Sequence, residues 1–511
     1  MKQLIIILVI LLSFINGQGQ NTFHKLIYTD FPLVRFTAVL PTDSCYYFTG
    51  TFVDTISPLR TGAMFGKIDL NGELLLLKVI KHPDILYFND LGDLFSTAQG
   101  NLVNVGIKDD FYARAILYLY NQEGDTILTK EYLSILYPKQ TWLVPKAVRI
   151  KPDGGFIILI GHESLAYNDF DISLLILDSE YNILHYKAYG TAFQETARSV
   201  ILDNDGGFII GADRNNLNLT STNFSSRTYI IKTDSTGEVI WQYLSPSGIL
   251  QDEAKAMIKT PDGGLVVASG IGIEVPVHPT LHYINWDAMI FKLDADRNVV
   301  WSTPLRGVFP TTQTGLVEMV ASADGSGFVA VGKVADDVSG PEPMSGSWIV
   351  KVSPKGDSLW ARYYTIFDGV DVDPNPYDLK QTPDGGYVIV GNTLNLGQHA
   401  PGWIMKVDEY GCLVPGCHLV NASEENRERD VRLTLYPNPA SDFLNVWYYS
   451  ADGKGASFKV TDLQGKTLKS FETKQRDVTL IIPVWEYEPG VYFLQCFEGE
   501  RLVKTEKFVV E

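Results

Sequence analysis

Short apolar runs, each entered through a polar turn of the form Asp-Gly-Gly, recur along most of the chain. With positions 43, 99, 153, 205, 262, 324 and 384 as anchors, the intervals are 56, 54, 52, 57, 62 and 60 residues. Seven copies at this spacing indicate a repeat architecture. The clear copies occupy residues 151–156, 204–208, 261–265, 323–328 and 383–387, and weaker copies occupy 42–46 and 98–102.

Each copy predicts a β-hairpin, because Pro-Asp favours a type I turn and the Gly after it supplies a positive φ. A second unit follows, in which a Lys precedes a Gly turn and Trp stands four residues after the Gly, at 232–241 and 351–360. The stretch 292–301 keeps this spacing without the Gly. One repeat therefore predicts four strands, with tight turns between the first and second and between the third and fourth.

Four-stranded units of this length cannot bury both faces alone, whereas radial stacking buries them. The predicted fold is all-β: a seven-bladed β-propeller followed by a small Ig-like β-sandwich. The seventh copy reaches only its third strand, at 403–406, and an unassigned strand, 23–28, precedes the first copy. We expect this N-terminal strand to complete the seventh blade. An open β-solenoid is the alternative, because the sequence does not report curvature.

The repeat resembles propeller repeats of exported proteins of Bacteroidetes, which pair a W-x-x-K-x-D-x-x-G-x-x-x-W string with a D-G-G turn. Trp348 and Trp403 occupy the first Trp position of that pattern. The resemblance covers about residues 22–417. Because its motifs are structural, it implies a fold and says little about chemistry.

The N-terminus has the layout of a signal peptide over residues 1–19: Lys2, an apolar run from Leu4 to Ile15, and a small-residue exit. The run is shorter than the roughly 18–20 apolar residues that a membrane-spanning helix needs, and no later segment approaches that length. We therefore expect export, with no integral membrane segment in the mature chain. A buried first strand is the alternative.

The net charge of the chain limits the kinds of partner that we expect. The chain has 60 acidic and 42 basic residues, a net charge of -18, which repels phosphate backbones and anionic membranes. A nucleic-acid partner is not expected. The 26 Tyr, 25 Phe and 44 Gly suit short strands and tight turns, in keeping with an all-β chain.

Four cysteines are too few for a disulfide-built scaffold. Cys412 and Cys417 enclose a short loop in which Pro and Gly can make a turn, so we expect a disulfide between them. It would add roughly 2 kcal/mol by the loop-entropy relation. Zinc binding is the alternative, although a second ligand pair at finger-like spacing is missing.

The composition changes after Cys417. We expect the propeller over residues 20–417, an exposed charged linker over 418–431, and a C-terminal domain over 432–511. This last segment carries six or seven short apolar strands separated by turns, which predicts an Ig-like sandwich.

The C-terminal segment resembles the type A C-terminal sorting domain of the type IX (Por) secretion system. The motifs are Tyr-Pro-Asn-Pro, Pro-Gly-Val-Tyr and a terminal Lys-Phe-Val-Val. The resemblance implies recognition by the outer-membrane translocon, removal by a sortase near the linker, and a cell-surface or extracellular destination. An ordinary Ig-like binding module is the alternative. The implied signal residues are Tyr436, Pro437, Asn438, Pro439, Gly490, Tyr492, Lys507, Val509 and Val510.

Catalytic motifs are missing from the sequence. There is no His-Glu-x-x-His, phosphate-binding glycine loop, Gly-x-Ser-x-Gly elbow or EF-hand loop, and no cofactor or metal is expected. The recurrent Asp residues could suggest calcium, yet each stands where a hairpin turn favours Asp. His278 and His282 are four apart, but Pro279 argues against a helix that would pair them. The Lys-to-Trp spacing resembles the docking motif of quinoprotein propellers, where it also serves to lock blades together.

One face of the propeller is the predicted binding face. The connections between second and third strands and between successive repeats are the long ones, and in an up-and-down blade they emerge on the same side. Binding residues are frequent on such loops. The candidate ligand-binding residues are Tyr283, Trp286, Asp287, Asp368, Asp371 and Asp373.

Two functions remain open. One is a non-catalytic surface propeller that binds glycan or protein through this face. The other is a propeller enzyme, either a glycan-active hydrolase or lyase or a quinoprotein, with carboxylates gathered at the channel mouth.

Overall fold

The structure of the chain is a computed structural model. It describes residues 21–54, 60–89, 93–110, 113–132, 143–164, 169–191, 193–215, 226–246, 253–278, 281–305, 312–336, 345–367, 370–394, 400–414, 416–418, 431–436, 438–441, 443–450, 455–463, 465–474, 477–499 and 501–510. Two compact units divide the chain, residues 1–415 and 416–511. The predicted signal peptide and most of the predicted linker lie outside the described residues.

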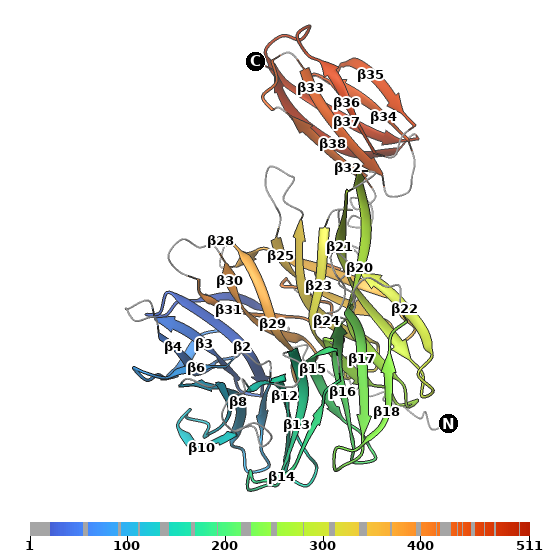
Figure 1. Cartoon of the computed structure of the whole chain (residues 1–511). Coiled ribbons are helices and arrows are strands. Elements are labelled where there is room, and N and C mark those ends of the chain that lie inside the picture. The colour runs from blue at the N-terminus through green and yellow to red at the C-terminus, as the bar shows by residue number, and fades with distance from the viewer. Residues whose placement is uncertain are drawn as a thin grey trace, which may run out of the picture. The chain divides into compact units, whose positions relative to one another are not determined.

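The first unit consists of antiparallel sheets with four strands each, of which the second carries one short extra strand (Figure 1). The innermost strands are β2 (Leu33–Pro41), β6 (Leu86–Phe88) with β7 (Leu94–Ser96), β11 (Leu143–Ile150), β15 (Gln194–Leu202), β19 (Ala256–Lys259), β23 (Thr312–Ala321) and β29 (Asp373–Gln381). The second strands are β3 (Tyr46–Asp54), β8 (Leu102–Asp109), β12 (Phe156–Ser164), β16 (Phe208–Asn215), β20 (Leu265–His278), β24 (Phe328–Asp336) and β30 (Tyr387–Leu394).

The outer half of each sheet follows the same order. The third strands are β4 (Arg60–Ile68), β9 (Ala113–Tyr120), β13 (Asp169–Leu177), β17 (Ser226–Thr233), β21 (Leu281–Leu293), β25 (Ser345–Val352) and β31 (Gly402–Val407). The outermost strands are β5 (Leu74–Ile80), β10 (Thr126–Tyr132), β14 (Ile183–Tyr189), β18 (Val239–Leu244), β22 (Val299–Leu305), β26 (Ser358–Tyr364) and, in the last sheet, β1 (Phe23–Ile27). A two-stranded hairpin, β27 (Ile366–Phe367) and β28 (Val370–Asp371), stands between the sixth and seventh sheets.

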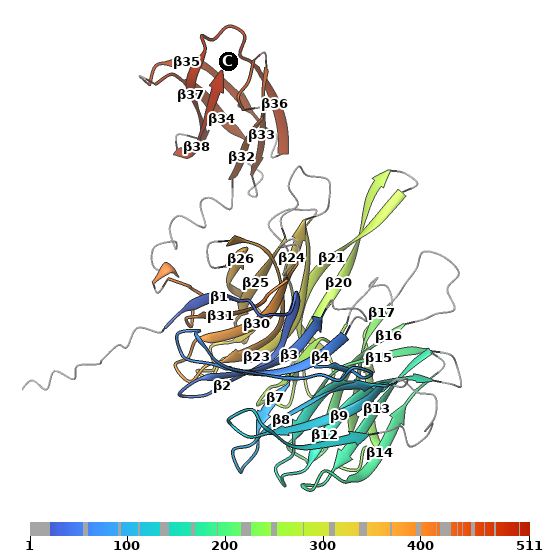
Figure 2. The ribbon, with the colours of Figure 1, turned by 90° about the vertical axis from the view of Figure 1, so that its left-hand side faces the viewer.

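The sheets follow one another around a closed ring. Each innermost strand contacts the neighbouring sheet in chain order, and β2 of the first sheet contacts β29 and β30 of the last. This β-propeller is compatible with the predicted seven blades. The ring closes because β1 pairs with β31, from Phe23 opposite Lys406 to Ile27 opposite Gly402 (Figure 2).

The innermost strands carry a β-bulge at a repeated position. One residue is left out of the pairing with the second strand in five of them: Thr37, Lys146, Arg198, Val317 and Tyr377. Lys255 takes the same place just before β19, with its N–H bonded to the Ala268 carbonyl at 2.9 Å. A bulge re-aims the side chain of the extra residue. In five sheets, from Lys146 to Tyr377, the side chain at this position lies at the axis of the ring.

Neighbouring sheets interlock through the turn between third and fourth strands. The Trp301 ring lies so close to Gly356 of the next sheet that a Cβ there would come within 2.7 Å of it, and Trp360 lies 2.8 Å from the Cβ position of Gly411. In the last sheet Phe23 of β1 takes this place against Gly72 of the first sheet, at 2.7 Å. Phe23 faces Lys406 in register, as Trp360 faces Lys351. The N-terminal strand thus supplies the missing docking aromatic.

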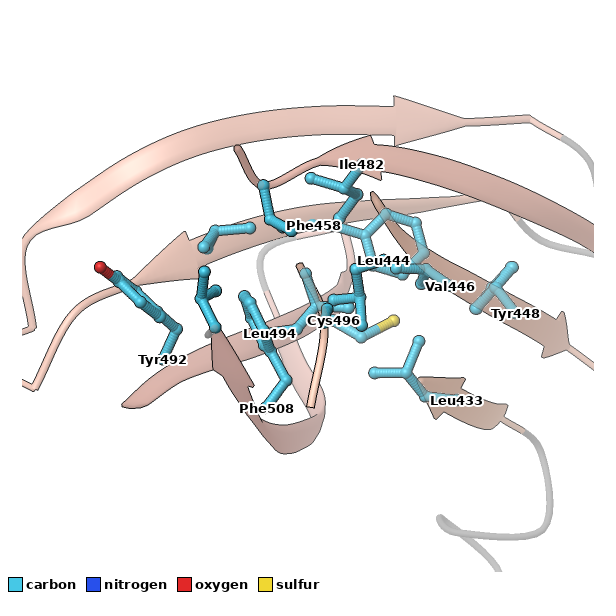
Figure 3. Packing of buried hydrophobic residues seen from close by; sticks show 14 of the residues in the cluster. Leu433, Leu444, Val446, Tyr448, Phe458, Ile482, Tyr492, Leu494, Cys496 and Phe508 are labelled. Atoms are coloured by element: carbon cyan, nitrogen blue, oxygen red, sulfur yellow. The ribbon is translucent and has the colours of Figure 1, made fainter. Parts of the chain in front are cut away.

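The second unit contains two sheets. One has the order β32 (Val431–Tyr436), β33 (Phe443–Ser450), β36 (Asp477–Pro483), and the other β35 (Thr467–Thr473), β34 (Ala456–Thr461), β37 (Gly490–Glu498), β38 (Arg501–Val510). Side chains from both sheets enclose one apolar core (Figure 3), in which Phe458 packs edge-on against Tyr448 at 5.4 Å. Two sheets over a shared core are compatible with the predicted Ig-like sandwich.

Candidate functional site

A cavity of about 120 Å³ lies among the innermost strands of the propeller. Strands β11, β15, β19, β23 and β29 contribute to it, together with Asp93 just before β7. Because residues from six sheets line it, this is the central channel. The charged lining residues are Asp93, Lys146, Arg149, Arg198, Lys255 and Glu318.

Three cations of the channel occupy one position of the repeat. Lys146, Arg198 and Lys255 each stand seven residues before the Asp of their hairpin turn. They occupy the bulge position, or in Lys255 the place that corresponds to it, in three consecutive sheets, and all three line the cavity. At the same position the next two sheets place Val317 and Tyr377, which also line it. The bulge thus makes one part of the channel wall cationic.

Carboxylates of the channel clamp sheets together. Asp93 accepts a hydrogen bond from the Val148 N–H of the next sheet at 2.8 Å, and it pairs with Arg149 at 2.6 Å. Asp378 does the same across the closure of the ring, where it accepts from the Val39 N–H at 2.8 Å. Both carboxylates therefore stabilise the boundary between two neighbouring sheets.

Glu318 is a channel carboxylate with a raised pKa. Burial raises its pKa to about 7, against the attraction of Lys380 and with the repulsion of Asp378. Burial also raises the pKa of Asp378, although Lys380 opposes this. For Lys380 burial lowers the pKa, but Asp378, Glu318 and Asp93 outweigh burial and raise it. A carboxyl group that titrates near neutrality can exchange a proton at physiological pH.

A second cavity of about 370 Å³ lies beside the channel, between the fifth and sixth sheets. Lys255 and Val317 line both cavities, so the two spaces are neighbours. Its wall includes the half-buried Trp286 of β21 and Lys333 of β24. Lys333 pairs with Asp373 at the start of β29, with 2.9 Å between Nζ and Oδ1. We call the two cavities together the channel site.

The structure brings together two of the six predicted ligand-binding residues. Trp286 lines the channel site, and Asp373 holds Lys333 in its wall. Asp287 differs from the expectation: it is 3% exposed, within β21, because β20 and β21 stay paired where an open loop was expected (Figures 1 and 2). Tyr283 lies in β21 and Asp371 in β28, but their side chains, like all of Asp368, lie outside the described residues.

The channel residues were missed by sequence reasoning. Lys146, Arg198 and Glu318 lie in innermost strands and Lys255 lies just before one, whereas the prediction concerned the long connections. The sequence did contain a signal for Lys146, Arg198 and Lys255, because each stands seven residues before the Asp of its hairpin turn.

The recurrent turn Asp residues have structural partners. Asp205 pairs with Lys232 at 2.6 Å and Asp262 with Lys292 at 2.5 Å, the Lys in each case coming from the third strand. Asp205 also accepts from the Gly207 N–H at 2.9 Å. These contacts agree with the turn interpretation over a calcium site. Likewise the Trp301 N–H donates to the Pro354 carbonyl of the next sheet at 3.2 Å, which locks neighbouring blades together.

A third cavity, of about 610 Å³, lies between the sixth and seventh sheets, among the hairpin turns. Trp360, Tyr387 and Tyr410 contribute aromatic rings to its wall. Because Trp360 docks on Gly411, part of this wall has a structural role.

The motifs of the C-terminal unit meet around its last strand. Asn438 accepts from the Val509 N–H at 2.9 Å and donates to the Lys507 carbonyl at 3.1 Å. Tyr492 packs on Phe508 with 5.6 Å between ring centroids, and Gly490 pairs with Val510. Pro439 is exposed, and Pro437 and the Tyr436 side chain lie outside the described residues. Motif residues that are far apart in the sequence therefore contact one another at the last strand, β38.

Residues 434–511 match the family described as "Secretion system C-terminal sorting domain". This unit is a type IX sorting domain. A protein that carries it is exported through the outer membrane to the cell surface or the extracellular space, and the domain engages the type IX secretion machinery. In the described part of the chain no helix is long and apolar enough to cross a membrane.

The cysteines next to the sorting domain are oxidised. Cys412 and Cys417 are disulfide-bonded, whereas Cys45 and Cys496 are buried free thiols. Cys412 also lies near Asp408 and His418, within 4.8 Å between ligand atoms. Because its sulfur is bound in the disulfide, it is not a thiolate ligand for zinc.

No curated protein matches the chain. Similar solved structures include an ulvan lyase of a polysaccharide lyase family (TM-score 0.47, 8% identity, 77% of this chain and 99% of that one). The β-propeller domain of the Trilobed protease from Pyrococcus furiosus is another (TM-score 0.33, 12% identity, 81% and 94%). An α-L-arabinanase from Penicillium chrysogenum is a third (TM-score 0.38, 13% identity, 62% and 92%). All three TM-scores are below 0.5, so we take nothing about chemistry from them.

Proposed function

We propose that the propeller is a non-catalytic binding module, presented at the cell surface or released from it, that binds a glycan through the channel site. The observation that carries this proposal is the pair of neighbouring cavities, about 370 Å³ and 120 Å³, whose walls combine a half-buried Trp with charged groups. Binding sites for small ligands typically occupy some hundreds of Å³ and combine apolar wall with a few placed polar groups.

Different residues of the channel site would contact different parts of a sugar. The flat apolar face of Trp286 offers stacking area for the C–H face of a pyranose ring. Lys333 and Lys255 supply ammonium donors for hydroxyl oxygens, and the Glu253 carboxylate supplies an acceptor. Asp373 and Glu253 each pair with one of these lysines, which limits the freedom that binding must remove.

The test is a binding screen of the full chain against plant, algal and host glycans, followed by titration calorimetry on the best ligand. Trp286→Ala should weaken binding about tenfold or more, because an interface Trp often contributes 2 kcal/mol or more. Trp485→Ala is the matched control, since that Trp is 55% exposed and lies in the sorting domain. Failure of every glycan, or binding only to a host protein, would refute the proposal.

A propeller enzyme is the second candidate, and the channel carboxylates favour it. Glu318, whose pKa burial raises to about 7, has the protonation behaviour of a general acid or base. Asp378 lies close enough to contribute to that shift. Incubation of the bound glycan with the protein, with product analysis by mass spectrometry, distinguishes the two candidates. Cleavage that Glu318→Gln abolishes would establish an enzyme.

A further inference from the structure

We propose that the outer face of one sheet of the sorting domain is the surface through which this domain binds the type IX secretion machinery. The surface consists of Phe443, Trp447, Ile481 and Trp485, and we call it the aromatic face. Its partner would be an apolar groove with basic side chains at its edge, on a protein of that machinery. Because the aromatic face belongs to the sorting domain, it is independent of glycan binding by the propeller.

The alternation of β33 places two aromatic side chains outside the core. Leu444, Val446 and Tyr448 are buried between the two sheets (Figure 3). Because successive side chains of a strand point to opposite faces, Phe443 and Trp447 lie on the outer face of β33. Phe443 is 47% exposed, and Trp447 is half-buried.

The neighbouring strand β36 extends this surface. Its core residue is Ile482, and Ile481 just before it is 65% exposed. The register of β33 and β36 places Ile481 diagonally between Phe443 and Trp447, within reach of both rings. Trp485 packs edge-on against Phe443, with 4.9 Å between ring centroids. Four large apolar side chains therefore form one contiguous surface.

A contiguous apolar surface with a polar edge marks a site of protein interaction. Aromatic side chains are enriched at the centre of such interfaces. The edge of the aromatic face is acidic, because the exposed residues Glu486 and Glu488 follow Trp485 in the same connection. An apolar groove with basic side chains at its edge would complement both the rings and the carboxylates.

Several motif side chains of the sorting domain are engaged within the domain. Tyr492 and Phe508 are buried and pack on each other, and Val510 is buried as well. The Asn438 side chain bonds to the backbone of the last strand. These four side chains stabilise the fold, so the surface that a partner contacts must include other residues.

The motifs also hold the two connections that carry the aromatic face. Just before β33, the Ala440 N–H donates to the Val509 carbonyl of the last strand at 2.8 Å. The Tyr492 hydroxyl donates to the Glu488 carbonyl at 2.6 Å, in the connection that contains Trp485. Because the sorting motifs hold this surface in place, we take the sorting machinery as its partner.

Export of the full chain by its native host tests the assignment. Ile481→Thr combined with Trp485→Ser should lower the initial rate of export, measured by pulse–chase and cell fractionation, about tenfold or more, because truncation of a central interface Trp has an effect of this size. Leu468→Thr is the matched control, since Leu468 is 39% exposed on β35 of the other sheet. Thermal unfolding of the purified chains shows whether each variant is folded.

Photo-crosslinking identifies the partner while the surface stays apolar. A benzophenone amino acid at position 481 of the full chain should cross-link to a protein of the type IX machinery, identified by mass spectrometry of the outer-membrane fraction. The same probe at position 468 should not capture that protein. This measurement applies even if the double variant fails to fold.

Three results would overturn the proposal. One is export of the folded double variant at the rate of the Leu468→Thr chain. Another is capture of the machinery from position 468 as readily as from position 481, or from neither. The third is cross-linking from position 481 only to a second copy of the chain, which would make the aromatic face a self-association surface.

Discussion

Phe23→Ala should open the propeller ring locally. Phe23 is 8% exposed, packs against Tyr46 with 6.0 Å between centroids, and lies against Gly72 of the first sheet. Truncation of a buried Phe to Ala costs about 3–5 kcal/mol. Because β1 is only five residues long, most of this loss should appear as easier release of β1 from β31.

Hydrogen exchange of the β31 amides, measured by mass spectrometry on the full chain, reports this release. A loss of 3–5 kcal/mol corresponds to exchange that is faster by about two to three and a half orders of magnitude. Phe23→Trp should retain protection, because Trp fills the same docking position in other sheets. Tyr28→Ala is the control, since Tyr28 follows β1 and is 58% exposed. Equal exchange in the Phe23→Ala and Tyr28→Ala proteins would show that the ring does not depend on this contact.

Three further predictions concern blade locking, pH and export. Tyr189→Phe removes the hydrogen bond to the Gly237 carbonyl of the next sheet, 2.8 Å long, and should lower the free energy of unfolding by about 0.5–1.5 kcal/mol, whereas Tyr28→Phe at an exposed ring should not. Lys292 and Thr260 lower the pKa of Asp262 to about 2 from 3.8. The ionised form of Asp262 therefore adds stability above pH 3.8, and this stability is lost as pH falls through 2. Asp262→Asn should lower the melting temperature at pH 7 and not at pH 2, and an equal loss at both pH values would contradict this. Deletion of residues 432–511 should leave the propeller in the periplasm by cell fractionation, and surface display of the truncated chain would refute the role of the domain.

The repeat period and the strand count could be predicted because both follow from local turn chemistry. Asp-Gly-Gly specifies a tight hairpin whatever the tertiary context, so its copies mark the units. Counting strands left 23–28 unassigned at one end and one strand missing at the other. The pairing of Phe23–Ile27 with Gly402–Val407 resolves both.

The channel could not be predicted, because a bulge changes which face a side chain occupies. In a regular strand Lys146 would share a face with the buried Val148, two residues later. The unpaired position at 146 removes that constraint and sends the ammonium toward the axis. From the alternation of apolar and polar positions alone, these cations would therefore be assigned to a buried face of the strand.

Trp286 was predicted with the wrong local structure for a related reason. The stretch from 270 to 287 was expected to be part of a long connection between the second and third strands, but β20 and β21 remain paired through it. Continued pairing buries Asp287 and places Trp286 against the neighbouring sheet's cavity wall. Pairing between β20 and β21 determines the local structure around Trp286, and the local sequence pattern does not reveal this pairing.

The most direct test of the channel site is a crystal structure of the full chain with its tightest-binding glycan. The account predicts a sugar ring on Trp286, with sugar hydroxyl groups within hydrogen-bonding distance of Lys333 and Lys255. Sugar bound instead in the cavity of Trp360, Tyr387 and Tyr410, or outside all three cavities, would contradict the account.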